Sequence, residues 1–182
     1  MARRKYLQDY EIITKPDKQG RETAKLEYCG DFYEVLFHKG SLSSYRNISL
    51  LVLLLTLALH VYAGFINNDG MRQFYVLIPY AIAYLPYFNF SAGIINIPGR
   101  QPAYRRDQIE LSFKRIRSAN FYLVVLLTTI VVSECVYLLF FTSGVNLHLD
   151  HLFLLLELLA AVALWMYARV HKNTLIKKQT EE

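Results

Sequence analysis

Three ionisable side chains lie inside long apolar stretches of the sequence, where they could carry proton or cation chemistry. They are His60, Glu134 and Glu157. A charged group at the centre of a bilayer costs about 2.5–3.5 kcal/mol on insertion scales, so such groups usually face the interior of a bundle and have polar partners. Counting the helical rise from the expected helix ends places all three at similar depths, about 9–13 Å below one membrane surface.

Tyrosines supply candidate partners for these groups. Tyr80 and Tyr84 are four residues apart and therefore share one helix face. With His60, Glu134 and Glu157 they make up the predicted intramembrane polar site. Two carboxyls held close together would share a proton, and such a pair could carry a proton, bind a cation or contact a basic substrate. The same groups could instead fix helix packing or face a partner subunit, and the sequence leaves these roles open.

The elements that position these residues are four apolar runs. They cover residues 48–66, 74–97, 119–142 and 151–168. A helix needs about 20 mostly apolar residues to cross the hydrocarbon core, where it satisfies its own backbone hydrogen bonds. We therefore predict a membrane all-α protein, with a four-helix transmembrane bundle over residues 48–171. Pro79 and Pro86 should bend the second span, for which a re-entrant hairpin is the alternative.

The basic residues alternate between the expected sides of the membrane. The five segments outside the apolar runs contain 9, 1, 6, 0 and 4 Lys or Arg residues in chain order. Basic residues accumulate in cytoplasmic segments. Four spans with both termini in the cytoplasm place 19 of the 20 basic residues there. We expect an integral protein of a bacterial cytoplasmic membrane with this topology.

The first 47 residues form a separate polar region. Three stretches, 10–15, 22–29 and 32–38, have the composition of strands and are separated by turn residues. They predict a small N-terminal cytoplasmic β-meander of three antiparallel strands. Three strands are near the minimum for independent stability, so the meander should lean on the membrane domain or on a partner. Residues 172–182 are expected to form a charged cytoplasmic tail.

The inner loop, residues 98–118, is strongly basic but also has an apolar pattern. Ile109, Phe113 and Ile116 recur at helical spacing. This pattern fits a short interfacial helix on the anionic leaflet or, equally, an extension of the third span. The residues predicted to contact lipid or a partner are Arg105, Arg106, Lys114, Arg115 and Arg117.

Other chemistry finds little support in the sequence. The two cysteines, Cys29 and Cys135, are far apart and form no CxxC motif, so no metal site or cofactor is predicted. No catalytic motif is present, and we lean against an enzyme. The net charge of +5 comes from residues that flank the apolar runs, which favours contact with the lipid bilayer over nucleic acid.

Two functions are consistent with these features. The first is an accessory or regulatory subunit that acts with a membrane protein partner or with itself, because the chain is small and has no transport or catalytic motif. The alternative is a small oligomeric transporter or carrier that uses Glu134 and Glu157 to bind a proton or cation.

Overall fold

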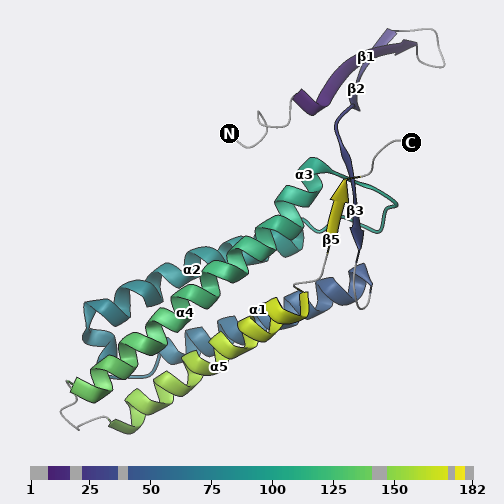
Figure 1. Cartoon of the computed structure of the whole chain (residues 1–182). Helices are drawn as coiled ribbons and strands as arrows, with labels where there is room; N and C mark the ends of the chain where they lie inside the picture. Colours follow the sequence, from purple (N-terminus) through teal and green to yellow (C-terminus); the bar gives the residue numbers. More distant parts are fainter. Residues whose placement is uncertain (1–7, 17–21, 37–40, 141–146, 172–174, 179–182) are drawn as a thin grey trace.

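Four long helices dominate the computed structural model, which describes residues 8–16, 22–36, 41–140, 147–171 and 175–178. The helices are α1 (Leu42–Gly64), α2 (Phe74–Ile95), α4 (Arg115–Phe140) and α5 (Leu147–His171). They pack in a ring in which α2 contacts α1 and α4, and α5 contacts α4 and α1. Figure 1 shows these helices running side by side along one long axis.

Three helical segments of this bundle are long and apolar enough to cross a membrane. They are Leu42–Gly64, Arg106–Phe140 and Leu147–His171. Large apolar side chains point outward from these helices, as expected of a lipid-facing surface; Leu51 is 64% exposed and Leu139 is 77% exposed. The prediction of a helical membrane protein is confirmed to this extent. In the fourth helix, α2, the apolar residues are interrupted by tyrosines and prolines.

Two helices differ in detail from their expected form. Helix α1 begins at Leu42 instead of residue 48, because Ser41 caps it: the Ser41 Oγ accepts a hydrogen bond from the Ser44 amide at 3.3 Å. Helix α2 runs through both Pro79 and Pro86 without interruption. The second apolar run is therefore one helix and not a re-entrant hairpin.

The basic inner loop continues directly into the third long helix. Strand β4 (Tyr104–Arg105) leads into α3 (Arg106–Ile109), then a π-helical turn, η3 (Glu110–Lys114), and then α4. Ile109, Phe113 and Ile116 are buried against the bundle. Of the two alternatives for this segment, the structure has the extension of the third span, because the apolar stripe is covered by protein.

The strands that the structure describes form two small sheets, so the expected three-stranded meander was wrong. Strands β1 (Tyr10–Pro16) and β2 (Glu22–Tyr28) form an antiparallel hairpin, whereas β3 (Phe32–Leu36) pairs with β4 on one side and β5 (Leu175–Lys178) on the other. The charged tail expected at 172–182 thus contributes a strand. Strand β5 pairs with β3 because its Ile176 lies opposite Val35, which is buried on β3. Ile176 thus covers Val35 although the two residues are far apart in the sequence.

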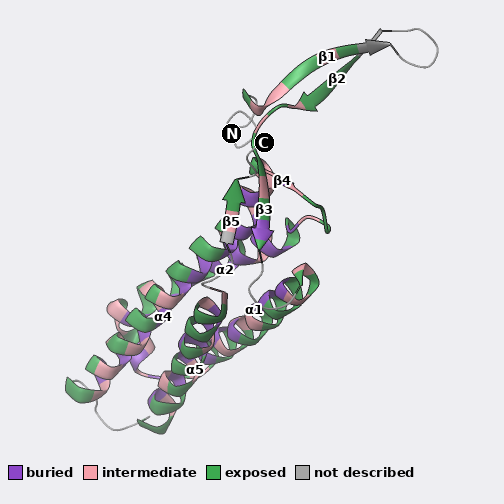
Figure 2. Cartoon of the chain, turned by 45° about the vertical axis from the view of Figure 1, so that its right-hand side comes forward, coloured by how far each residue is buried: buried purple, intermediate pink, exposed green. Residues whose placement is uncertain are grey.

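Both sheets lie at the same end of the helical bundle, and the β1–β2 hairpin projects beyond it (Figure 1). In Figure 2 most of this hairpin is drawn as exposed. Its base is tied to the start of α3: the Tyr28 hydroxyl accepts a hydrogen bond from the Arg106 amide at 3.1 Å, and the Tyr10 hydroxyl lies 3.4 Å from Asp107 Oδ2.

Candidate functional site

A buried imidazole joins three helices in the bundle core. The His60 Nδ1 of α1 lies 2.8 Å from the Glu157 Oε1 of α5, and both side chains are fully buried. The His60 Nε2 lies 3.3 Å from the backbone oxygen of Tyr80 in α2. We call His60, Tyr80, Tyr84 and Glu157 the His60 cluster. It unites four of the five residues of the predicted intramembrane polar site.

Tyrosines of α2 hold the imidazole ring in place. The Tyr80 ring stacks on His60 with 4.1 Å between the ring centroids and 29° between the planes. The Tyr80 hydroxyl donates to the His60 carbonyl oxygen at 2.8 Å and lies 3.2 Å from the Tyr84 hydroxyl. Tyr87, which was not among the predicted site residues, contributes a third ring 5.5 Å from His60. The imidazole is therefore enclosed by one face of α2.

The hydrogen bonds of His60 determine how many protons the His60–Glu157 pair carries. A backbone carbonyl can only accept, so Nε2 carries a proton toward Tyr80. A second proton must then lie between Nδ1 and the Glu157 carboxyl, on one atom or the other. Either arrangement has zero net charge, as an imidazolium with a carboxylate or as a neutral imidazole with a carboxylic acid. A net-neutral, hydrogen-bonded pair is what a low-dielectric core tolerates.

Glu134 occupies a different site, at the end of the bundle where α1 connects to α2. Its carboxyl is fully buried and lies 3.4 Å from the Asn68 Nδ2. Gly70, in the short helix η2 (Gly70–Arg72), packs directly on this carboxyl, and a Cβ at that position would overlap it. The adjacent Asp69 amide donates to the Asp150 Oδ1 at 2.8 Å. We call Asn68, Gly70, Glu134 and Asp150 the Glu134 site.

The structure does not bring the two predicted carboxyls together. Glu157 is bonded to His60, and Glu134 contacts the loop between α1 and α2. Asp69 and Gly70 are adjacent, so Asp150 and Glu134 lie at the same level of the bundle. Glu157 follows Asp150 by seven residues, which places it about 10 Å deeper along α5. The expectation of one common layer for the ionisable groups is therefore wrong for Glu134.

Sequence reasoning missed the partners of Glu134. Asn68, Gly70 and Asp150 lie outside the apolar runs, so they looked like ordinary loop residues. The available signal was Asp150, an acidic residue in the first turn of α5, where a carboxylate is favourable. Nothing local in the sequence indicates that the loop folds inward over Glu134.

The five basic residues that were predicted to contact lipid or a partner lie in different surroundings. Arg105 lies over the rings of Tyr10 and Tyr28, with its Cζ 5.9 Å and 5.8 Å from their centroids. Arg106 Nε lies 3.3 Å from Glu110 Oε1. These two residues support the attachment of the hairpin.

The other three basic residues lie one or more turns further along the same helix. Lys114 Nζ is 3.9 Å from Glu110 Oε1, and an Arg115 guanidinium nitrogen donates to Asn89 Oδ1 at 2.7 Å. Arg117 is exposed.

The hairpin base contains two perturbed phenols. Burial and the neighbouring Asp107 carboxylate raise the pKa of Tyr10, and burial raises the pKa of Tyr28. Both effects favour the neutral phenol in the docked hairpin.

Within the described part of the chain, no group of three or more His, Cys, Asp or Glu side chains could hold a metal ion. Comparisons of the chain with protein-family models, curated proteins and solved structures give no match. The function therefore has to be argued from the geometry alone.

Proposed function

We propose that this chain is a four-span membrane protein with both ends in the cytoplasm, and that it acts as an accessory or regulatory subunit of a membrane partner. Helix α2 has 22 residues, about 33 Å, which is sufficient for a fourth span. The strands β1 and β5 lie at one end of the bundle, as an even number of spans requires (Figure 1). The excess of Lys and Arg at that end supports a cytoplasmic location.

The observation that carries the subunit role is an exposed apolar pair on the projecting hairpin. Ile12 of β1 lies directly opposite Leu26 of β2, and their side chains are 73% and 61% exposed. Tyr10 and Tyr28 form the next pair on the same face, two residues toward the base, where they attach to α3. One face of the hairpin is thus anchored at its base and uncovered further out.

This arrangement favours a protein partner for physical reasons. A two-stranded hairpin is marginally stable alone in water, so a second surface would stabilise it. The exposed edges of β1 and β2 can also pair with a strand of another chain. A cytoplasmic segment of a neighbouring membrane protein would supply both contacts. A second copy of the chain is the other candidate for this surface.

The experiment is purification of the tagged chain from its native membranes in mild detergent, followed by mass spectrometry of stoichiometric partners. The wild type should retain one partner protein, and the double variant Ile12→Thr with Leu26→Thr should lose it, since threonine keeps strand propensity but removes the apolar contact. The matched control, Glu11→Gln with Glu27→Gln, changes the opposite face and should retain the partner. A chain that purifies alone under these conditions would contradict the proposal.

The second candidate function is a small carrier, which the fully buried His60–Glu157 pair favours. The second carboxyl oxygens of Glu134 and Glu157 accept no hydrogen bond within the described residues. A buried carboxyl oxygen without a hydrogen-bond partner is a place where a proton or cation could bind, and Glu157 is the deeper of the two in the bundle. The purified protein would then move protons or cations across liposomes, and Glu157→Gln would abolish this flux without loss of helical content. Liposomes without flux above empty controls would eliminate this candidate.

A further inference from the structure

A groove of about 560 Å³ runs between the end of α2 and the beginning of α4, near the strand-bearing end of the bundle. Helices α2 and α4 approach closely beside it because Gly93 has no side chain: a Cβ there would overlap Ile116. The residues that line the groove and enter the argument are Asn89, Glu110, Lys114, Arg115, Ser118 and Tyr122.

One end of the groove has an excess of positive charge. Glu110 lies between Arg106 and Lys114, so two cations share one carboxylate. The Arg115 guanidinium is held instead by a neutral group, the Asn89 amide oxygen, at 2.7 Å. Among the described residues Arg115 forms no ion pair. Its remaining donors and the half-exposed Lys114 ammonium are available to an anion, and a guanidinium can bind phosphate through two parallel hydrogen bonds.

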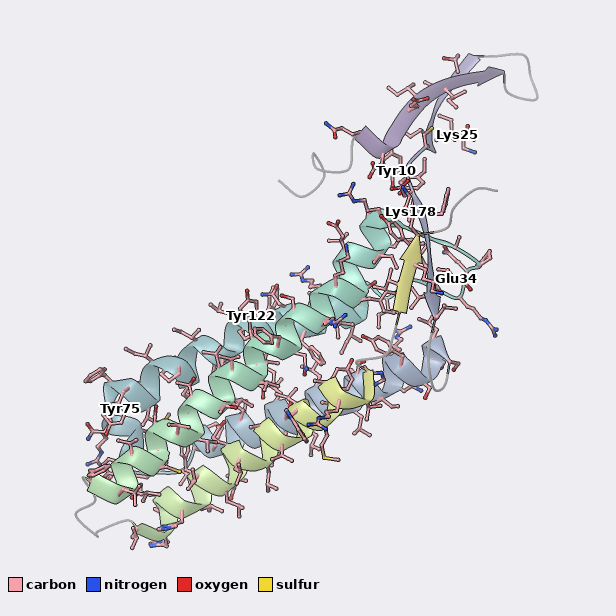
Figure 3. All side chains as sticks on the ribbon, viewed as in Figure 1. Tyr10, Lys25, Glu34, Tyr75, Tyr122 and Lys178 are labelled. Atoms are coloured by element: carbon pink, nitrogen blue, oxygen red, sulfur yellow. The ribbon has the colours of Figure 1, made fainter. Side chains whose placement is uncertain are left out.

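The other end of the groove is aromatic and apolar. Tyr122 lies two helical turns after Lys114 and is 57% exposed. Figure 3 labels Tyr122 along the length of α4, away from Tyr75 at the far end of the bundle. Val125, the next exposed residue along α4, is apolar and 47% exposed. Along the helix axis the groove therefore changes from cationic to aromatic, and an exposed apolar residue follows it. A bilayer leaflet changes in the same order from headgroup to acyl chain.

We infer that this groove is a binding site for one anionic phospholipid. Its phosphate lies between Lys114 and Arg115, and its glycerol backbone and first methylenes lie along Ser118 and Tyr122. A free phosphate would use only the cationic end and would leave the aromatic end empty. This inference rests on α4 crossing the membrane, and it does not depend on a protein partner or on proton transport.

The test uses the full-length protein in nanodiscs of phosphatidylcholine with a minor fraction of phosphatidylglycerol, extracted and weighed by native mass spectrometry. The wild type should retain one phosphatidylglycerol per chain. Lys114→Gln with Arg115→Gln should lower the retained fraction at least about tenfold. Ser118→Trp, which fills the groove and leaves its charge intact, should lower it as well. Circular dichroism should show unchanged helix content in both variants.

The matched control is Arg46→Gln with Arg169→Gln, which removes two exposed charges at the same end of the bundle, outside the groove. Retention within about twofold of the wild type is expected of this control. An equal loss in the control would show that only overall charge matters and would overturn the site. Displacement of the lipid by millimolar inorganic phosphate, or no selective retention of phosphatidylglycerol by the wild type, would overturn it too.

Discussion

The His60 Nδ1 of α1 lies 2.8 Å from the Glu157 Oε1 of α5, in a region from which solvent is fully excluded. The opposite ring nitrogen reaches the Tyr80 carbonyl, so one side chain links three of the four long helices. Stability should depend on keeping both members of the pair or neither. Removing one partner of a buried pair leaves the other unsatisfied, whereas an apolar replacement of both is tolerated far better.

We expect Glu157→Leu to lower the free energy of unfolding by about 2–4 kcal/mol, between the values for membrane hydrogen bonds and for buried ion pairs in soluble proteins. His60→Leu with Glu157→Leu should recover at least half of that loss. Unfolding in mixed micelles with increasing dodecyl sulfate measures both. If the double variant loses as much free energy of unfolding as His60→Leu and Glu157→Leu lose together, the two residues do not act as a pair.

The contact between Gly70 and Glu134 predicts a glycine-specific effect in the loop between α1 and α2. A Cβ at position 70 would overlap the Glu134 carboxyl, so Gly70→Ala should destabilise the protein by about 1–3 kcal/mol, the usual penalty of overpacking. Glu134→Ala in the same chain should relieve the overlap. The control is Gly99→Ala, where the space around the added Cβ is open. Equal melting temperatures for Gly70→Ala and Gly99→Ala would argue against this contact.

The pairing of β5 with β3 predicts that the C-terminal segment protects a distant strand. Ile176 lies opposite Val35 and is partly buried against the core. Ile176→Asp should therefore release β5, and amide hydrogen exchange in Phe32–Leu36 should become faster. Lys177→Gln, on the exposed alternate position, serves as the control and should leave exchange unchanged. Equal exchange in all three proteins would mean that β3 does not need β5.

The phenols at the hairpin base predict a loss of docking at high pH. Their pKa values are raised above the ordinary value of 10.0. A raised pKa in the docked state contributes stability that is complete below the ordinary value and is lost as pH rises through the raised one. Spin labels on β2 and α2 should report one distance at pH 8 and a broadened distribution above pH 11. Tyr10→Phe with Tyr28→Phe should abolish this pH dependence; a response that persists would assign it to other groups.

The helices were the predictable part of this fold. Long apolar runs determine where a helix can cross a bilayer, and their centres needed no tertiary information. The ends of the helices depended on local detail. Ser41 extends α1 by capping it. The segments α3 and η3 extend α4 because Ile109 and Phe113 are buried against the rest of the protein. A capping serine is visible in a sequence, but the surface that covers an apolar stripe is not.

The partners of individual groups were less predictable. Tyr80, Tyr84, His60 and Glu157 could be brought together because each lies on a recognisable helix face. The pairing of Glu134 with Asn68 depends on how a loop folds inward, and the pairing of β3 with β5 joins segments about 140 residues apart. Strand patterns identify strands but leave their neighbours open, since any apolar strand face can cover another.

The central claim is that α2 crosses the membrane, so that the chain has four spans and its strands lie in the cytoplasm. The direct measurement is labelling of single cysteines with a membrane-impermeant maleimide in intact cells, in a background with Cys29 and Cys135 replaced by serine. Arg72→Cys, exposed before α2, should be labelled from outside, and Gly99→Cys, in open space after α2, only after the cells are lysed. If both positions react from the same side of the membrane, α2 does not cross it, and the proposed topology is wrong.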